Sequence, residues 1–332
     1  APGVFAGGWF DIFLQGTLDG FVARETGGGP GARGRNYLVM EWGTHGRDTT
    51  RDYKYKANRH DFSDSDLRRR FFEYHLKGNT SALDGIAKVN YYILGDDTDP
   101  NAPGNEWRTA DTWPPYPVRE TPLYLGTDGL LAANPAPDGG AFLEFTFDPN
   151  DPYPTWGGAN LLPNLVSGPY DQRKHSTSRT DLLKFATAPL DAPLEILGKV
   201  KARLFVSSDA PDTDFTAKLV DIYPNGDGRE IIVLDNIRRV KTRQGFDREA
   251  PPLQGVGLVD RGGDDVDHDL AAAGAADEVV MRRRAGAGID GFAVLQLRLG
   301  DQPLVDEEVE AAIDRCRVDS RVLCTHTLQD AG

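Results

Sequence analysis

The stretch that decides the fold runs from Val4 to Gly46 and opens with VFAGGWFD, residues 4–11. Its first apolar residues have the length of a buried strand, and the Gly-Gly pair before Asp11 predicts a tight turn. Apolar residues at helical spacing follow, and a second apolar run, YLVM at 37–40, leads to His45. Both polar residues therefore follow a predicted buried strand, at the sheet edge where α/β proteins collect functional groups.

An Asp and a His at such positions are two of the three groups of a catalytic triad. A His acts as general base toward a hydroxyl nucleophile when a buried Asp holds its second ring nitrogen in the right tautomer. In α/β-hydrolases the order is nucleophile, acid, His, so Asp11 and His45 place the nucleophile upstream of both. None of the nine serines in the chain lies in a Gly-x-Ser-x-Gly sequence. The alternative is that Asp11 only caps the following helix and that His45 is an ordinary loop histidine.

A polar loop and a second helix are predicted after His45. Residues 47–61 are polar and charged, which indicates a surface loop. Ser63 and Asp66 then resemble a capping box, and Gly78 is suited to end the helix that they begin. We expect the apolar stripe of this helix to pack into the core of an α/β layer. The stripe consists of Leu67, Phe71, Phe72, Tyr74 and Leu76.

From Ala87 the pattern changes to short apolar runs separated by turns, several of them rich in Pro, Gly, Asp or Asn. This pattern indicates an antiparallel β-sandwich that continues to about Val240. The runs lie at 89–94, 121–125, 141–147, 182–187, 200–207 and 215–223.

Beyond Gly255 the alternation is lost, and Ala, Gly, Arg and Asp are enriched. We therefore expect this tail to pack poorly or to adopt a structure unrelated to the sandwich. One hypothesis is a shifted reading frame, because GC-rich codons encode this composition out of frame; the alternative is a lineage-specific extension.

Nine motifs, in the same order along the chain, resemble those of the CocE/NonD hydrolases, the group of cocaine esterases, glutaryl acylases and X-Pro dipeptidyl-peptidases. They extend over most of the chain and fade after about Leu253. The motifs are GGWFDIFLQGTL at 7–18, Trp42 with THG at 44–46, FFEYHLKG at 71–78, DTWPP at 111–115, TPLYL at 121–125, DPNDP at 148–152, GGAN at 157–160, GPYDQR at 168–173 and VSSDAPDTDF at 206–215.

The resemblance implies a serine hydrolase of acyl esters or amides, in which Asp11 matches the family's triad acid and His45 its triad base. Trp42 stands one position earlier than the Trp of the family's Gly-Pro-Trp-Thr-His sequence. The family's nucleophile, oxyanion donors and helical cap have no counterpart in the chain. We therefore expect a C-terminal fragment that is inactive alone; the alternative function is a non-catalytic β-sandwich binding module.

The expected fold is an α/β-hydrolase C-terminal remnant followed by a mainly-β jelly-roll sandwich. Residues 1–82 would be the end of the catalytic domain. Residues 83–255 would form the sandwich, which the resemblance makes galactose-binding-like and similar to the C-terminal domain of X-Pro dipeptidyl-peptidases. Residues 256–332 would be the divergent tail.

Composition excludes several partners. The formal net charge of −14 disfavours nucleic acid and anionic membranes, and there is no run of eighteen apolar residues. Cys316 and Cys324 alone give no disulfide framework or zinc cluster. Asp209, Asp212 and Asp214 could offer oxygens to calcium, but Asp is also a common turn residue. We predict no metal and no cofactor, and a small-molecule ester, amide or short peptide as substrate. Self-association, and a cytoplasmic or secreted location, stay open.

Overall fold

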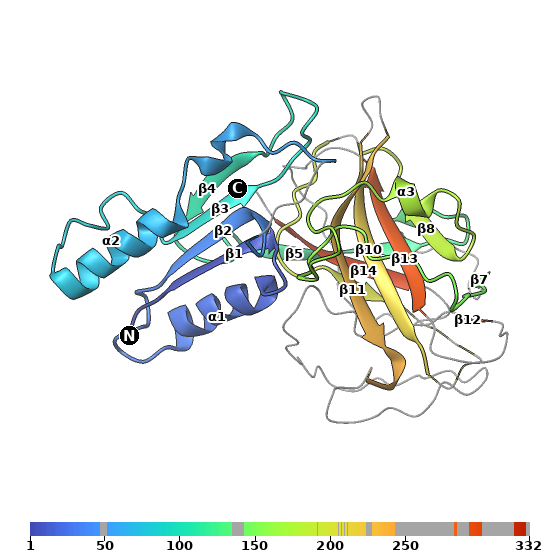
Figure 1. The fold of residues 1–332 in the computed structure, drawn as a ribbon, viewed down its shortest axis with the longest axis horizontal. Coiled ribbons are helices and arrows are strands. Elements are labelled where there is room, and N and C mark those ends of the chain that lie inside the picture. Colours follow the sequence, from blue (N-terminus) through green and yellow to red (C-terminus); the bar gives the residue numbers. More distant parts are fainter. Residues whose placement is uncertain are drawn as a thin grey trace.

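The computed structural model describes the N-terminal three quarters of the chain with short gaps, together with three strands of the tail (Figure 1). The described residues are 1–46, 52–134, 143–190, 192–204, 206, 208, 210, 212–223, 228–242, 282–283, 292–300 and 322–329. None of the helices among them is long and apolar enough to cross a membrane.

The first sheet has the strand order β1-β2-β3-β4. β1 (Val4–Phe10), β2 (Tyr37–Thr44) and β3 (Val89–Ile93) are parallel, and β4 (Glu106–Ala110) is antiparallel to β3. Successive side chains of a strand point to opposite faces, so each face can bury its own apolar set. This alternation lets one helix pack on each side of the sheet.

The helix α1 (Leu14–Gly27) covers one face of the first sheet, where Phe21 meets Phe5 of β1 edge to face, with 6.0 Å between ring centroids. The helix α2 (Asp64–Lys77) covers the other face, where Phe71 meets Tyr37 of β2 at 6.2 Å. Figure 1 shows the two helices on opposite sides of β1 and β2. Fully burying an aliphatic or aromatic side chain contributes about 1.5–3 kcal/mol to the stability of the fold. The packing of the two helices therefore helps to hold β1 and β2 in place.

Both ends of α2 follow the predicted signals. The Ser63 hydroxyl accepts a hydrogen bond from the Asp66 backbone N–H, and Gly78 ends the helix with a left-handed φ of 72°. The prediction for its apolar stripe was too broad, however. Leu67 and Phe71 are buried, whereas Phe72 and Leu76 are exposed, because only one side of a helix can face one sheet.

Within the described residues, the β-rich part forms two four-stranded sheets and a two-stranded one, in the orders β11-β10-β13-β8, β6-β5-β14-β9 and β12-β7. Each of the five predicted runs from 121 to 223 overlaps one of these strands. The bounds are β5 Val118–Leu125, β6 Leu131–Ala132, β7 Glu144–Phe145, β8 Leu182–Ala186, β9 Lys201–Arg203, β10 Asp214–Ile222, β11 Glu230–Arg239, β12 Arg282–Arg283, β13 Phe292–Gly300 and β14 Val322–Gln329, with short helices η1 Ala57–His60, α3 Arg173–Ser176 and η2 Val240–Thr242.

One hydrophobic core spans the β-rich part and draws on strands and loops from 123 to 240. Its buried members are Leu125, Leu131, Phe145, Phe147, Phe185, Val200, Ala202, Leu204, Val206, Phe215, Leu219 and Val240.

Two predictions about the strands were wrong. The run at 89–94 was expected to open the antiparallel sandwich, but it is β3, which pairs in parallel with β2 and completes the first sheet. The tail was expected to be unrelated to the sandwich, but β13 lies between β10 and β8, and β14 between β5 and β9. FAVLQLRLG at 292–300 has the alternation of a strand, which was overlooked within the Ala- and Gly-rich tail.

The ends of β1 and β2 approach most closely at two glycines. The register between the strands shifts between Gly8 and Phe10, and a Cβ atom on Gly8 would lie 2.2 Å from the Gly43 carbonyl oxygen. Such bulges often re-aim side chains next to functional sites. Only a residue without a side chain fits there, and the turn that carries Asp11 follows at once.

We expect Gly8→Ala to lower the free energy of unfolding by about 1–3 kcal/mol, the usual cost of overpacking a filled site. Urea unfolding of the purified chain measures this. The control is Gly7→Ala, since its Cβ would meet only the Thr17 side chain, at 3.3 Å. Equal unfolding midpoints for the two variants would contradict the close approach.

Candidate active site

Asp11 lies in the turn between β1 and α1, with 9% of its side chain exposed. Its backbone N–H donates to the Gly8 carbonyl oxygen at 3.1 Å, which closes the turn. Its Oδ1 accepts a hydrogen bond from the Phe13 backbone N–H at 2.8 Å, where α1 begins. One carboxylate oxygen therefore holds the turn before α1, but Asp11 is not the helix cap, because the N-cap residue is Phe13 and no side chain caps the helix. The other oxygen is left to face the next strand.

His45 follows β2 directly, and 47% of its side chain is exposed. Its Nδ1 lies 2.9 Å from Asp11 Oδ2. The ring also meets Phe13 edge to face, with 5.1 Å between centroids. The predicted hydrogen bond between loops at one edge of the sheet is thus confirmed; the catalytic roles of the two residues stay predictions.

The contact with Asp11 favours one tautomer of the neutral His45 ring. An ionised carboxylate only accepts hydrogen bonds, so the proton of the contact lies on Nδ1 of His45. Nε2 then carries the lone pair and is the basic nitrogen, on a ring that is half exposed. A nearly buried acid that holds the tautomer of a half-exposed imidazole is the arrangement that general-base activation of a hydroxyl requires.

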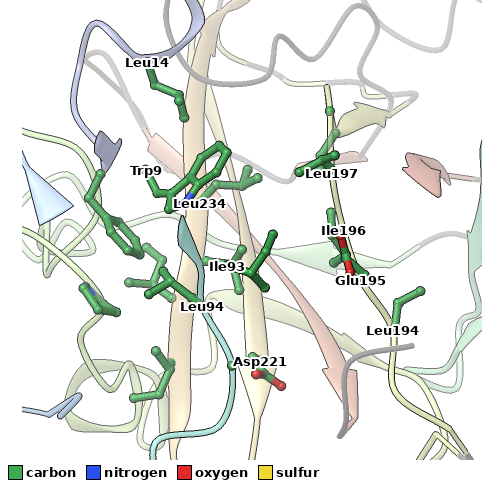
Figure 2. Close-up of a pocket in the computed structure, with 18 of the residues that line it drawn as sticks. Trp9, Leu14, Ile93, Leu94, Leu194, Glu195, Ile196, Leu197, Asp221 and Leu234 are labelled. Carbon is green, nitrogen blue, oxygen red and sulfur yellow. The ribbon is translucent and has the colours of Figure 1, made fainter. Parts of the chain in front are cut away.

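A cavity of 270 Å³ lies beside Asp11, between the first sheet and the β-rich part. Figure 2 shows walls that are mainly apolar and come from both parts, including Trp9, Ile93 and Leu197. Glu195 also lines the cavity. Its carboxylate accepts a hydrogen bond from Tyr116 Oη at 3.0 Å and forms an ion pair with Arg108 Nη1 at 2.6 Å. Among the described residues, Asp11 lines the cavity whereas His45 lies outside its walls.

The acidic residues considered for calcium serve as ion-pair partners where they are described. Asp212 and Asp214 both pair with Arg239, at 2.7 and 3.0 Å; Asp209 lies outside the described residues. No group of three or more His, Cys, Asp or Glu side chains that could hold a metal ion occurs within the described part. Cys316 also lies outside this part.

Sequence reasoning missed that residues following His45 are buried against the β-rich part. Residues 52–61 were predicted to be a polar surface loop, but Tyr53 is buried and packs with Tyr223 and Ile231 of the β-rich part. Burial raises the pKa of the Tyr53 hydroxyl well above its usual value, so it stays a neutral donor to the Gly95 carbonyl oxygen at 2.7 Å. The alternation in Tyr53-Lys54-Tyr55 was the available signal.

Comparison with known proteins assigns the family. Residues 81–258 match the model of the X-Pro dipeptidyl-peptidase C-terminal non-catalytic domain. The chain is 37% identical over 256 residues to cocaine esterase of Rhodococcus sp. (strain MB1 Bresler), an alignment that covers 73% of this chain and 42% of that protein. The chain belongs to the CocE/NonD family of hydrolases and carries its C-terminal domain. Asp11 and His45 both precede the matched domain.

Two solved structures share the fold. One is an aminopeptidase from a marine sediment Thaumarchaeota archaeon, with a TM-score of 0.62 at 21% identity, covering 99% of this chain and 47% of the other. The second is an α-amino acid ester hydrolase, with a TM-score of 0.57 at 21% identity, covering 99% and 48%. The chain thus spans less than half the length of cocaine esterase and of each of these two proteins.

Proposed function

We propose that the chain is the C-terminal part of a serine hydrolase of acyl esters or amides, with Asp11 as triad acid and His45 as triad base. The observation that carries the proposal is the 2.9 Å contact between Nδ1 of His45 and Oδ2 of Asp11. These side chains follow adjacent parallel strands, and the acid is nearly buried, as a triad acid should be. The substrate is a small-molecule ester, an amide or a short peptide.

The proposal places the serine nucleophile and the oxyanion donors on protein N-terminal to the 332 residues. Its support is the chain order nucleophile, acid, His in α/β-hydrolases and the lack of a Gly-x-Ser-x-Gly sequence. The share of cocaine esterase that the chain matches, 42%, agrees with this. The nucleophile would approach Nε2 of His45 from the exposed side of the ring.

The proposal extends to the fold. Residues 1–82 are the C-terminal end of an α/β-hydrolase domain, which the parallel strands β1 and β2 between two helices support. The jelly-roll, galactose-binding-like sandwich expected over residues 83–255 would begin after β4, because β3 and β4 complete the first sheet, and 256–332 would be the divergent tail. The parallel pairs of β13 with β10 and β8 depart from an all-antiparallel jelly roll. The shifted reading frame stays a hypothesis, which resequencing of the gene tests.

The experiment compares this chain with the complete protein encoded by the gene. A fluorophosphonate probe, which labels activated serines, should label the complete protein and leave the 332-residue chain unlabelled, because a base without its nucleophile forms no acyl-enzyme. Aryl esters and X-Pro anilides, assayed side by side, should be hydrolysed by the complete protein alone. Ester hydrolysis by the chain alone would refute the division of the site. A complete protein that neither reacts with the probe nor hydrolyses a substrate would favour the binding module.

A further inference from the structure

Residues 53–59, which come after His45 in the chain, pack against the end of β2 just before it. Trp42, three residues before His45, packs against Tyr55 with 4.5 Å between ring centroids, and Tyr55 packs against Tyr53 at 5.0 Å. The guanidinium of Arg59 lies over the Trp42 ring at 4.9 Å. The chain just before His45, at Trp42, and the chain after it, at Tyr55, are therefore in contact.

The chain after His45 is also bound to the β-rich part. Arg229, just before β11, donates from Nη1 to the Asp52 carbonyl oxygen. The Asp52 carboxylate in turn accepts from the Asp171 backbone N–H at 3.1 Å. Asp52 is seven residues after His45, a span of at most about 24 Å of extended chain. Asp52 is thus held from both its carbonyl and its side chain.

A buried ion pair fixes Arg229. Its Nη2 lies 2.6 Å from Asp97 Oδ1, and the two side chains are 12% and 1% exposed. The second oxygen of Asp97 accepts from the Lys54 backbone N–H at 2.7 Å, and the Arg229 guanidinium lies 4.7 Å from the centre of the Tyr223 ring. Arg229 and Asp97 are therefore joined by an ion pair, and they hold residues 52 and 54 by hydrogen bonds to the backbone. Planar, bidentate donors such as Arg are suited to this task.

We propose that Arg229, with Asp97, is a positioning residue for the triad base: the pair holds residues 52 and 54, and through the contacts of Tyr53 with Tyr55 and of Tyr55 with Trp42 it keeps His45 on Asp11 with its proton on Nδ1. The inference rests on the proposed function for the role of His45, and it goes further by giving the β-rich part a share in catalysis. His45 is bracketed by two fixed points, Trp42 and Asp52, and the second of these is held from the β-rich part. Release of residues 52 and 54 would loosen the contact of Tyr55 with Trp42 and let the half-exposed imidazole leave Asp11.

The first test needs no activity. Two-bond ¹H–¹⁵N correlation spectra of imidazole rings distinguish the Nδ1–H from the Nε2–H tautomer, and they can be recorded on the 332-residue chain. The Nδ1–H form of His45 is expected in the parent chain and should be lost in Asp11→Asn. The double variant Arg229→Gln/Asp97→Asn removes both charges together, so that neither is left buried alone. We expect it to shift His45 toward the Nε2–H form while the chain stays folded.

The matched control is Arg179→Gln/Asp181→Asn. Arg179 is 11% exposed and pairs with Asp181 at 2.6 Å, so this variant also removes a partly buried ion pair. Both partners belong to the β-rich part, and the contacts described for Arg179 are with Asp181, Asp151 and the Tyr153 ring. The tautomer of His45 should not change in the control. If the double variant of Arg229 and Asp97 unfolds, Arg229→Lys takes its place, since it keeps the charge but loses the bidentate hydrogen bonding of the guanidinium.

The second test uses the complete protein. The Arg229→Gln/Asp97→Asn variant should lose about 10²-fold in kcat with KM unchanged, the size of effect expected when a catalytic group is misplaced by about an ångström. Unchanged kcat and an unchanged His45 tautomer would overturn the positioning role while leaving the proposed function intact. An Nδ1–H tautomer that survives Asp11→Asn would instead refute the proposed function itself. The two failures are thus distinguishable.

Discussion

Replacing His45 by Ala in the complete protein should lower kcat by about 10⁶-fold, the loss found when the triad base of a serine protease is removed. The reason is geometric. Nδ1 of His45 is committed to Asp11 at 2.9 Å, so Nε2 is the nitrogen that would take the proton of the nucleophile. Without it, the serine stays a weakly nucleophilic hydroxyl at neutral pH. Aryl-ester turnover under single-turnover and steady-state conditions measures the loss.

The control for this prediction is His60→Ala. His60 is exposed, and its ring meets Trp42 edge to face at 5.9 Å, so it lies near the same loop without touching Asp11. Its removal should change kcat less than about threefold, since surface substitutions away from a site usually have small effects. A complete protein in which His45→Ala and His60→Ala behave alike would show that another group accepts the proton, and the assignment of the base would be wrong.

The local elements of the first sheet were predictable from the sequence because their signals are local. Val4–Ala6 and Tyr37–Met40 are apolar runs bounded by turns, and the signals at Ser63 and Gly78 mark both ends of α2. The structure extends both strands by four residues, to Phe10 and Thr44. The added residues form the ends that carry Asp11 and His45.

The pairing of strands that lie far apart in the chain could not be predicted from the sequence. The run at 89–93 alternates in the same way whether it opens a sandwich or joins β2 in parallel, and only tertiary packing decides between the two. The tail strands β13 and β14 were missed for a related reason. Composition averaged over the whole tail hid two short runs of eight or nine residues, each of which finds its partners far away in the chain.

Part of the candidate site could likewise be predicted from the sequence, and part could not. Asp11 and His45 could be paired from their positions after two strands and from the family motifs, although 34 residues separate them. The pair of Arg229 with Asp97 joins residues 132 positions apart, and both lie outside the predicted strands: Asp97 follows the run at 89–94 and Arg229 follows the run at 215–223. No periodicity or motif connects them, because an ion pair between two loops leaves no repeating pattern in the sequence.

The Asp11→Asn variant of the complete protein should lose about 10⁴-fold in kcat, the loss caused by the equivalent change in a Ser-His-Asp protease. This corresponds to about 5.4 kcal/mol of transition-state stabilisation. An Asn amide can still accept the Phe13 N–H through Oδ1, so the turn into α1 should persist. Its other atom becomes a donor facing Nδ1 of His45, which favours the tautomer with the proton on Nε2 and removes the base.

Folding and chemistry can therefore be separated at this position. The urea midpoint of the 332-residue chain should change little in Asp11→Asn, while turnover in the complete protein collapses. The control is Asp19→Asn on α1, which also removes one carboxylate; Asp19 accepts from Gln15 Nε2 at 2.8 Å on the same helix and lies away from His45. It should retain near-normal turnover. Near-normal turnover in Asp11→Asn would mean that a different carboxylate orients His45, because a carboxamide cannot hold the imidazole in the reactive tautomer.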